Sequence, residues 1–269
     1  MVSTVHGGQP GTGLQGSQLL ASLPPRDLET IRRELERVRL DAERAIMHAH
    51  APVRRVYFPE SGLVALSVTM ADGRTAGVTI VGSEGIIGLA AAYGDTGPMD
   101  ATVLVAGTAH WMPAERFKSA LRDSEPLRRL VGMYSVAMLR HLGQTVACNR
   151  LHSLDQRSAR WLLVARDRIG GDSFPLTQEA FADLLGVSRP AVSTVGARFA
   201  REGAAEFRRG TVHIVNAERL EKASCECLAA DRDAVAPLTA PIGEPAHRMT
   251  RNLPRTAMGL IRPEIRRAR

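Results

Sequence analysis

Hydrophobic and polar positions change their period along this chain, and each period predicts a different kind of element. Between residues 18 and 40, apolar side chains recur every three or four positions, at Leu28, Ile31, Leu35 and Val38. This spacing places the four side chains on one face of a helix. The pattern therefore predicts helical structure over this stretch.

Between residues 53 and 112 the pattern becomes that of strands. Short runs rich in Val, Ile, Thr and aromatic residues are separated by turn residues, and the ADGR segment at 71–74 is typical of a hairpin turn. This succession predicts a compact antiparallel β-roll or barrel. A short helix is expected at 114–121, directly after it.

From Pro126 to about Ile169 the helical period returns. We expect a break near His152, because Ser153 can cap a second helix that begins at Leu154. The two apolar strips of the first helix are Leu127, Val131, Tyr134, Met138, Thr145 and Cys148 on one side, and Leu130, Leu139, Leu142 and Val146 on another. A helix that is apolar on two sides must bury both. We expect one strip to pack on the roll and the other on a second copy of the chain; the alternative is a helix buried within a monomer.

The segment TQEAFADLLGVSRPAVSTVGARFAR, which begins at Thr177, follows the spacing of a helix-turn-helix. Ala182 is small enough for one helix to cross closely over the other, and Gly186 supplies the positive φ that a sharp turn requires. Thr177 and Ser188 precede the two helical runs and can cap their free amides. Pro190 falls in the first turn of the second helix, where a missing amide costs little.

The second helix of this unit presents a polar face that would enter a DNA major groove. The following EFRRGTVHIV segment predicts two short strands joined at Arg209 and Gly210, which is the wing of a winged helix. Arginines at its tip would contact phosphates. The candidate DNA-contacting residues are Thr177, Gln178, Ser188, Arg189, Pro190, Ser193, Thr194, Arg198, Arg208 and Arg209.

The charge of the chain is positive overall but not in this module. The formal net charge is +7, whereas residues 171–222 contain seven Lys and Arg against seven Asp and Glu. DNA binding there must depend on the placement of charges rather than on their total. The acidic residues expected to lie away from the DNA are Glu179, Asp183, Glu218 and Glu221.

Composition and motifs exclude several classes of protein. No run approaches the ~20 apolar residues of a membrane span, and the first residues lack the features of a signal peptide. Three cysteines favour a reducing compartment over a disulfide framework. We therefore expect a cytoplasmic protein with no membrane partner. The G-x-S-x-G, HExxH and P-loop motifs are absent, so we predict no catalytic residues and no enzyme activity.

The order of these predicted parts resembles that of the Crp/Fnr family of bacterial transcription regulators. The parts are a β-roll, a long helix, a second helix and a winged helix-turn-helix. The resemblance covers roughly residues 20–228. It rests on VYFPESG, GSEGIIG, NRLHSLDQRSARWLL, LTQEAFADLLGVSRPAVS, RRGTVHIVNAERLE and the terminal CEC. It implies an α+β fold with an N-terminal antiparallel β-roll (a double-stranded β-helix, as in cyclic-nucleotide-binding domains), a long dimerisation helix and a C-terminal winged helix-turn-helix.

The family also implies an assembly and a set of partners. A homodimer would present two recognition helices to half-sites about one helical turn (~34 Å) apart on a near-palindromic double-stranded DNA operator, with RNA polymerase as a further partner. The predicted domains are a disordered start (1–17), a sensory β-roll (18–125), dimerisation and connecting helices (126–170), a winged helix-turn-helix (171–228) and a disordered Pro- and Arg-rich tail (229–269).

An effector pocket is implied by the same resemblance, with Gly82, Glu84 and Gly85 in the roll and Gln144 and Thr145 on the long helix as candidates. The alternative for the last two is polar contacts within a helix interface. An unknown small molecule or a redox signal would act there. Binding of DNA without any effector is the alternative, because some members of the family need none.

A cyclic nucleotide is not expected as that effector. Members that bind cyclic AMP grip its phosphate with an arginine, and the corresponding position falls at about Met99, followed by Asp100. A methionine cannot pair with phosphate, and the neighbouring aspartate would repel it.

No metal or cofactor is predicted. Cys148, Cys225 and Cys227 are too few for a four-thiolate iron–sulfur cluster within one chain, and they are not near the N-terminus as in oxygen-sensing members. Cys225-x-Cys227 is too short a signal for zinc on its own. Cys148 is either a redox switch across a dimer or a small buried apolar residue. The histidines weighed as haem ligands and not assigned are His48, His50, His110 and His141.

The recognition helix departs from the better-known members. They carry a glutamate and a second arginine where this chain has Pro190 and Thr194, while Arg189 is retained and can contact guanine O6 and N7. We therefore expect one G·C pair read by Arg189 and a distinct consensus. The departures and the neutral charge leave an alternative function, a signalling or protein-docking module with a degenerate DNA-binding head. Salt-sensitive binding to duplex DNA separates the two.

Overall fold

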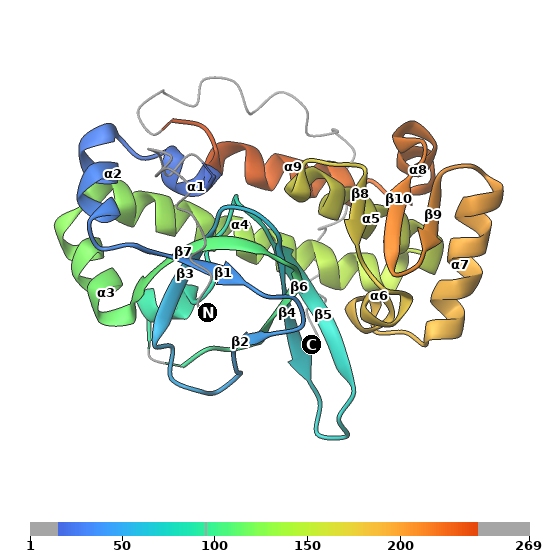
Figure 1. Ribbon diagram of the computed structural model, residues 1–269, viewed down its shortest axis with the longest axis horizontal. Coiled ribbons are helices and arrows are strands. Elements are labelled where there is room, and N and C mark those ends of the chain that lie inside the picture. Colours follow the sequence, from blue (N-terminus) through green and yellow to red (C-terminus); the bar gives the residue numbers. More distant parts are fainter. Residues whose placement is uncertain (1–15, 95, 242–269) are drawn as a thin grey trace, which may run out of the picture.

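A long helix runs through the molecule and connects a β-roll to a winged helix (Figure 1). The computed structural model describes residues 16–94 and 96–241. The helices are α1 (Gln18–Ala21), α2 (Pro25–Arg32), η1 (Leu89–Ala92), α3 (Ala114–Asp123), α4 (Glu125–Leu151), α5 (Leu154–Ile169), α6 (Gln178–Leu185), α7 (Arg189–Arg201), α8 (Ala217–Ala223), α9 (Cys227–Val235) and η2 (Ala236–Leu238). The strands are β1 (Glu36–Leu40), β2 (Ala45–Met47), β3 (Arg55–Pro59), β4 (Leu63–Thr69), β5 (Thr75–Val81), β6 (Asp100–Val105), β7 (Gly107–Pro113), β8 (Ser173–Pro175), β9 (Ala205–Arg208) and β10 (Thr211–Ile214).

The predicted antiparallel roll is confirmed. Within the described residues its strands form two antiparallel sheets, in the orders β1-β7-β3 and β2-β6-β4-β5. Strand β6 shows why they enclose a core: Ala101, Val103 and Val105 are buried, while the residues between them are only partly covered. Alternation of this kind turns one face of a strand inward. The β4–β5 hairpin turns through Gly73 at φ 84°, within the predicted ADGR segment.

The break between the two long helices is also confirmed. Ser124 caps α4 by accepting a hydrogen bond from the Leu127 amide at 3.2 Å, and α4 ends at Leu151. Ser153 then caps α5 in a reciprocal arrangement with Gln156, whose side chain accepts from the Ser153 amide. A capping box satisfies free amides on both sides of a helix start. The chain therefore begins a new helix here rather than extending α4.

The winged helix is built from local signals of the same kind. Helices α6 and α7 meet at Gly186, which has φ 65° and satisfies the end of α6 through bonds to Ala182 and Asp183 carbonyls. The wing strands belong to a sheet ordered β8-β10-β9. Aromatic and aliphatic side chains of α5, α6, α7 and this sheet share one core with residues of β4, β5 and β6. The head therefore packs against the roll as well as on α5.

The helical structure expected over residues 18–40 is confirmed for α1 and α2 and wrong for residues 36–40, which form a strand. Helices α1 and α2 are short, and Val38 lies in strand β1, paired with Ala109 of β7. Pro24 and Pro25 interrupt any continuous helix, because proline lacks an amide hydrogen and clashes with the preceding turn. The apolar spacing was compatible with a helix, and pairing with β7 decided otherwise.

The tail predicted from residue 229 is wrong for its first residues. Helix α9 and η2 extend to Leu238, and α9 packs on α4 and α5. Leu238 is buried in the core of the roll, and Asp231 is a buried residue of α9. The predicted disordered start, apart from Gly16 and Ser17, and the rest of the tail lie outside the described residues, while Ser17 is buried and caps α1. Across the described ranges, no helix is both long and apolar enough to cross a membrane.

Candidate functional site

The starts of α6 and α7 and the tip of the wing meet at one surface. They line an open groove to which Thr177, Gln178, Arg189 and Arg209 all contribute. Thr177 caps α6 as predicted, accepting a hydrogen bond from the Ala180 amide at 3.1 Å. The structure thus brings four of the predicted DNA-contacting residues onto one face.

Helix α7 turns its polar side outward at this groove. Val192, Val195 and Phe199 are buried in the shared core, while Arg189 and Thr194 are exposed. The Arg189 side chain is 65% exposed and lies 3.8 Å from Glu179. An exposed pair at this distance is weak, so the guanidinium can exchange Glu179 for another partner.

Ser188 and Pro190 stand at the first turn of α7. Ser188 occupies the N-cap position, but among the described residues its side chain makes no capping hydrogen bond. Pro190 lies in the first turn, as expected, and its carbonyl accepts a hydrogen bond from Thr194 Oγ1 at 3.0 Å. The Ser188 hydroxyl is thus left for an external partner, whereas the Thr194 hydroxyl is held by its own helix.

Two other predicted residues are committed to internal contacts. Ser193 Oγ donates to Gln178 Oε1 at 2.6 Å, which ties α7 to α6. Arg198 forms an ion pair with Asp155 of α5. Both contacts stabilise the position of the recognition helix. The structure therefore separates Arg198 from the groove that Arg189 lines.

The wing tip is a tight two-residue turn. Arg209 has φ 49° and Gly210 has φ 77°, and hairpins with positive φ at both central residues match the twist of their strands. Arg208 precedes this turn and lies 2.5 Å from Glu206. The side chains of Arg208 and Arg209 are both exposed beside the groove.

Glu179 does not lie where we expected it, away from the DNA-binding surface. Glu179 lines the same groove as Arg189 instead of facing away from it. Nearby, burial and the charge of Glu179 raise the pKa of Asp183. The groove therefore carries negative as well as positive charge, and Arg189 must compete with Glu179 for any phosphate or base.

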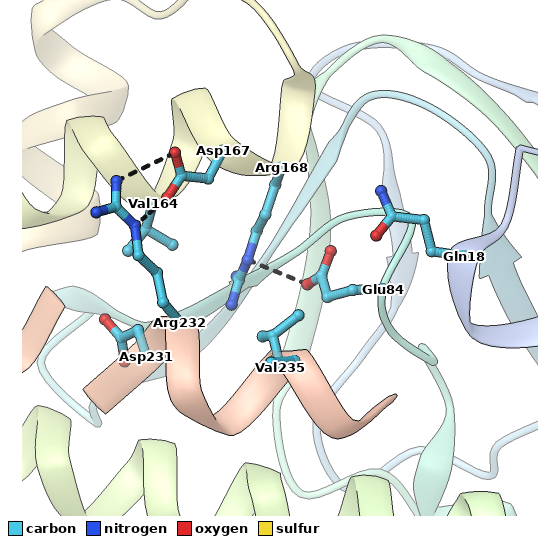
Figure 2. Close-up of a pocket in the computed structure, with 9 residues that line it drawn as sticks. Gln18, Glu84, Val164, Asp167, Arg168, Asp231, Arg232 and Val235 are labelled. Carbon is cyan, nitrogen blue, oxygen red and sulfur yellow. Dashed lines mark hydrogen bonds and ion pairs between the residues drawn. The ribbon is translucent and has the colours of Figure 1, made fainter. Parts of the chain in front are cut away.

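A second candidate site lies between the roll and the helices that cover it (Figure 2). A cavity of about 180 Å³ is lined by Gln18, Glu84, Arg168 and residues of α9. Glu84 is buried, its Oε1 accepts from the Gly82 amide at 3.1 Å, and Arg168 Nε lies 3.1 Å from the same oxygen. Within the described ranges, Glu84 Oε2 and Arg168 Nη1 are buried without a hydrogen-bond partner. Buried polar atoms of this kind call for a partner such as a ligand or water.

The two glycines predicted for this pocket allow helices to approach the roll. A Cβ on Gly82 would lie 2.9 Å from Arg168 Cβ, and a Cβ on Gly85 would lie 2.7 Å from the Tyr134 hydroxyl. Tyr134 is buried against this segment, and burial raises its pKa. These positions are therefore explained by close packing of α4 and α5.

Gln144 and Thr145 lie elsewhere, so the five effector candidates do not form one pocket. Gln144 Nε2 is 2.9 Å from Cys227 Sγ, and the Thr145 hydroxyl lies 3.3 Å from Arg160 Nη2. Gln144 thus meets Cys227 of α9, whereas Thr145 meets Arg160 of α5. The alternative, contacts within a helix interface, describes their position, and the helices they meet belong to the same chain.

Met99 and Asp100, which the sequence comparison placed at the phosphate-binding arginine, both make contacts within the roll. Met99 packs on the core of the roll. Asp100 Oδ1 accepts from the Ala49 amide at 3.0 Å, and Asp100 Oδ2 accepts from Thr69 at 3.2 Å. Both residues are therefore engaged within the roll, and neither offers a cationic group.

A buried group of charged side chains lies between α9, α4 and α5, and the sequence did not predict it. Asp231 lies 2.6 Å from Arg160 Nε through Oδ2, and 2.7 Å from His141 Nδ1 through Oδ1. Burial raises the pKa of Asp231, but the hydrogen bonds from His141 and Arg160 outweigh this and lower it. The carboxylate therefore stays charged and anchors α9 to α4 and α5. Since these partners are 90 and 71 residues away, no local pattern indicates the group.

The three cysteines also come together, which their positions in the sequence did not suggest. Cys148, Cys225 and Cys227 form a buried cluster, and His152 adjoins it. The junction between α8 and α9 folds back onto the end of α4, which brings Cys225 next to Cys148 across 77 residues.

Two protein families account for most of the described chain. Residues 37–124 match the family described as "Cyclic nucleotide-binding domain", and residues 156–223 match the "Crp-like helix-turn-helix domain". A curated relative, the CRP-like cAMP-activated global transcriptional regulator of Mycobacterium tuberculosis (strain ATCC 25618 / H37Rv), is 28% identical over 180 residues, which cover 64% of this chain and 80% of the relative.

Solved structures show the same fold. FixK2 from Bradyrhizobium japonicum aligns with a TM-score of 0.63 at 17% identity, covering 71% of this chain and 98% of FixK2. The c-di-GMP responsive global regulator CLP of Xanthomonas campestris aligns with a TM-score of 0.61 at 16% identity, covering 72% and 100%. Both likenesses concern the architecture alone.

The roll, the long helix and the winged helix follow one another in the order that this architecture requires. The relative that aligns over 180 residues is a transcriptional regulator. Such regulators bind DNA through the helix-turn-helix and are typically dimeric. This chain therefore belongs to the Crp/Fnr family of transcription regulators and carries a Crp-like helix-turn-helix DNA-binding domain beside a cyclic-nucleotide-binding-like roll.

Proposed function

We propose that this protein is a sequence-specific regulator that binds a near-palindromic operator as a homodimer. The observation that carries the proposal is the single groove lined by Thr177, Gln178, Arg189 and Arg209. It unites the start of the recognition helix with the wing tip, the two parts that read bases and hold phosphates in winged helices. A bacterial regulator acts on DNA in the cytoplasm, with RNA polymerase as a further partner.

Within this groove we assign base contact to Arg189 and backbone contact to the wing. An exposed arginine at the start of α7 can bind guanine O6 and N7 through two hydrogen bonds. Arg208 and Arg209 project from the wing tip and suit phosphate oxygens. Thr177, Gln178, Ser188, Pro190, Ser193, Thr194 and Arg198 complete the set of candidates, the last as a residue that positions α7 through Asp155.

The proposed dimer uses the outer face of α4. Val136, Leu139 and Val146 are 50%, 69% and 71% exposed, although the opposite face of the same helix is buried. Gly132 and Gly143 lie along the same stripe with open space beside them. Apolar residues at this spacing on a long helix suit the same stripe of a second copy, packed helix against helix. The two recognition helices would then face one side of the dimer.

For the effector we propose a small polar molecule in the cavity beside Glu84 and Arg168. Two buried polar atoms there lack a partner within residues 16–94 and 96–241, and the cavity touches the roll, α5 and α9 at once. A ligand that binds one packing of these elements better than another would shift the population of dimer arrangements. This would change the spacing of the recognition helices.

The first experiment selects binding sites from random duplex DNA with purified full-length protein, at near-physiological salt and without added ligand. A two-fold-symmetric site, with a complex containing two chains by mass, supports the proposal and shows that no effector is needed. Only weak, salt-sensitive binding indicates a missing signal in the roll. A selected site without two-fold symmetry, bound by one chain, contradicts the homodimer.

A second candidate function is a protein-docking module. The presence of Glu179 in the groove and the equal numbers of acidic and basic residues in the module favour it. Under this function the protein would bind no duplex DNA at any salt concentration. The same selection, repeated at low salt, distinguishes the two functions.

A further inference from the structure

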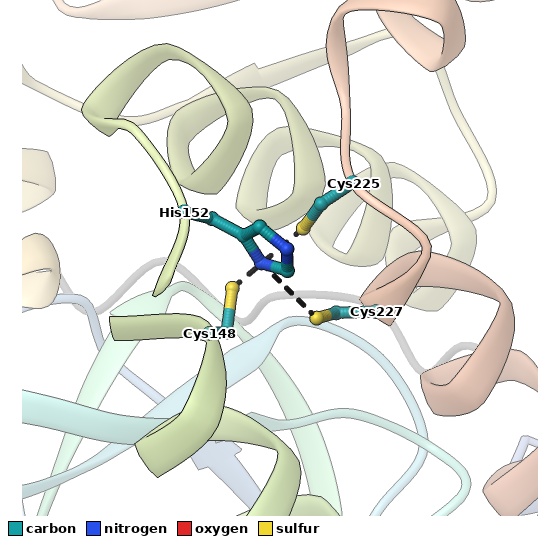
Figure 3. A group of neighbouring side chains, drawn as sticks. All are labelled: Cys148, His152, Cys225 and Cys227. Atoms are coloured by element: carbon teal, nitrogen blue, oxygen red, sulfur yellow. Dashed lines mark hydrogen bonds between the residues drawn. The ribbon is translucent and has the colours of Figure 1, made fainter. Parts of the chain in front are cut away.

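Four side chains meet where the end of α4 faces the junction of α8 and α9 (Figure 3). Cys148, His152, Cys225 and Cys227 each offer one ligand atom, and the four atoms lie within 4.8 Å of one another. The Sγ atoms of Cys148 and Cys225 are 3.6 Å apart, and Cys227 Sγ lies 3.5 Å from His152 Nδ1. Three sulfur atoms and one ring nitrogen therefore surround a single point.

We propose that this group binds one Zn²⁺ ion through the thiolates of Cys148, Cys225 and Cys227 and Nδ1 of His152. A tetrahedral zinc ion with Zn–S near 2.3 Å and Zn–N near 2.0 Å separates its ligand atoms by ~3.5–3.8 Å. The observed separations of 3.6 and 3.5 Å fall within that range. Two of the six separations between ligand atoms thus match a tetrahedral site, and the four atoms all lie within 4.8 Å of one another.

Other occupants fit the geometry less well. A disulfide between Cys148 and Cys225 would need sulfur atoms ~2.05 Å apart, and it would leave Cys227 and His152 without a role. An iron–sulfur cluster distributes its ligands over two or more iron atoms, whereas ligand atoms this close together can enclose only one ion. Three sulfurs and one nitrogen in a tetrahedron are typical of zinc.

The contacts around the four ligands also match those of a metal site. His152 Nε2 lies 3.3 Å from Glu226 Oε1, so a carboxylate can accept the second ring proton and leave Nδ1 free to bind the metal. Gln144 Nε2 donates to Cys227 Sγ at 2.9 Å, a contact that favours a thiolate.

The backbone explains why these residues meet. Cys148 and His152 are four residues apart, in the last turn and at the C-cap of α4, so both face the same side. Cys225 and Cys227 flank Glu226, the N-cap of α9. All three cysteines are buried. Because protein side chains fill all four positions, the ion would have a structural role and not a catalytic one. It would tie α9 and the DNA-binding head to the end of the dimerisation helix.

The test measures metal in full-length protein purified without added metal or chelator. Elemental analysis is expected to give about one zinc ion per chain, and Co²⁺ exchanged into the site is expected to give the strong visible bands of tetrahedral cobalt with thiolate ligands. Cys227→Ser and His152→Gln are expected to lose nearly all of the zinc. His48→Gln, which changes an exposed histidine of the roll, is expected to keep it.

Gln144 and Glu226 give a graded readout, because they touch the ligands and not the ion. Gln144→Ala and Glu226→Gln are expected to weaken zinc binding by about 10–100-fold in competition with a chelator. If Gln144 and Glu226 only supported the packing of α4 and α9, these substitutions would leave the zinc affinity unchanged.

The overturning results are equally definite. The proposal fails if folded wild-type protein contains no zinc and takes up neither Zn²⁺ nor Co²⁺, if it contains iron instead, or if mass analysis finds a Cys148–Cys225 disulfide. Where a cysteine variant does not fold, the wild-type protein decides. Alkylation of its thiols should release about one equivalent of zinc per chain to a colorimetric chelator, and no release contradicts the site. Neither outcome depends on DNA binding.

Discussion

At the scale of single residues, the recognition surface depends on arginines that differ in what holds them. Arg189 is exposed and only loosely paired with Glu179, whereas Arg198 on the same helix is paired with Asp155 of α5. Arg189 therefore faces the groove and can contact bases, whereas Arg198 faces α5 and holds α7 in place.

Arg189→Ala should lower affinity for the preferred operator by about 1–3 kcal/mol and relax the preference at one G·C pair, because it removes a bidentate contact with guanine. Repeating the site selection with the variant measures this. Arg201→Ala is the matched control, since it removes an exposed arginine at the opposite end of α7. Unchanged sequence preference in Arg189→Ala would refute the assignment.

Arg209→Ala should weaken binding to all duplexes alike and reduce the slope of log affinity against log salt by about 1, because one phosphate contact and its released counterion are lost. Titrations with operator and unrelated DNA at several salt concentrations measure the slope. Arg33→Ala, at an exposed arginine of the roll, should leave it unchanged. A loss confined to the operator would instead make Arg209 a base-reading residue.

At the scale of elements, α9 is the part of the fold that local patterns did not reveal. It buries Asp231 against Arg160 of α5 and His141 of α4, and it brings Cys227 to the end of α4. A helix held by buried charges is fixed in one register, because any slip separates the charges in a poorly solvated interior. We infer that α9 sets the position of α5 against α4.

Asp231→Ala should destabilise the protein by about 3–5 kcal/mol, because it leaves the buried Arg160 guanidinium without its carboxylate. Urea denaturation followed by circular dichroism measures the loss. Asp233→Ala is the control on the same helix, where the residue is exposed and the expected change is within about 0.5 kcal/mol. Equal losses in the two variants would show that the ion group does not hold α9.

At the scale of the whole molecule, α4 serves two surfaces. Its inner face packs on the roll and on α9, and its outer face carries Val136, Leu139 and Val146 in solvent. The proposed effector cavity and the proposed zinc site both lie where other elements meet α4 or α5. Signals at either place would therefore act on the helices that set the distance between recognition helices in a dimer.

Leu139→Glu should yield a monomer, because a charge in the centre of the apolar stripe would be buried without a partner. Affinity for a two-fold-symmetric operator should fall by about 100-fold or more, since the two heads no longer bind as one unit. Light scattering and operator titration measure both effects. Leu151→Glu introduces the same change at an exposed position outside the stripe and should stay dimeric. A Leu139→Glu dimer would place the interface elsewhere.

Much of the fold could be predicted from local signals. Strand alternation, the hairpin at Gly73, the capping box at Ser153 and the turn at Gly186 each depend on residues a few positions apart. The face of α7 followed from helical spacing in the same way. Where a local signal was ambiguous, as at Val38, pairing with Ala109 of a distant strand decided the outcome.

The sequence by itself determined the order of elements, the helix-turn-helix and its wing, because caps, glycine turns and periodicity act over short distances. Only the tertiary structure decided that Glu84 pairs with Arg168, that Asp231 pairs with Arg160, and that three cysteines meet His152. The residues in each of these contacts are tens of positions apart in the chain. Local periodicity therefore does not indicate which distant side chains will meet. Packing of α9 against α4 and α5 brings the last two groups together, and packing of α5 against the roll brings together the first.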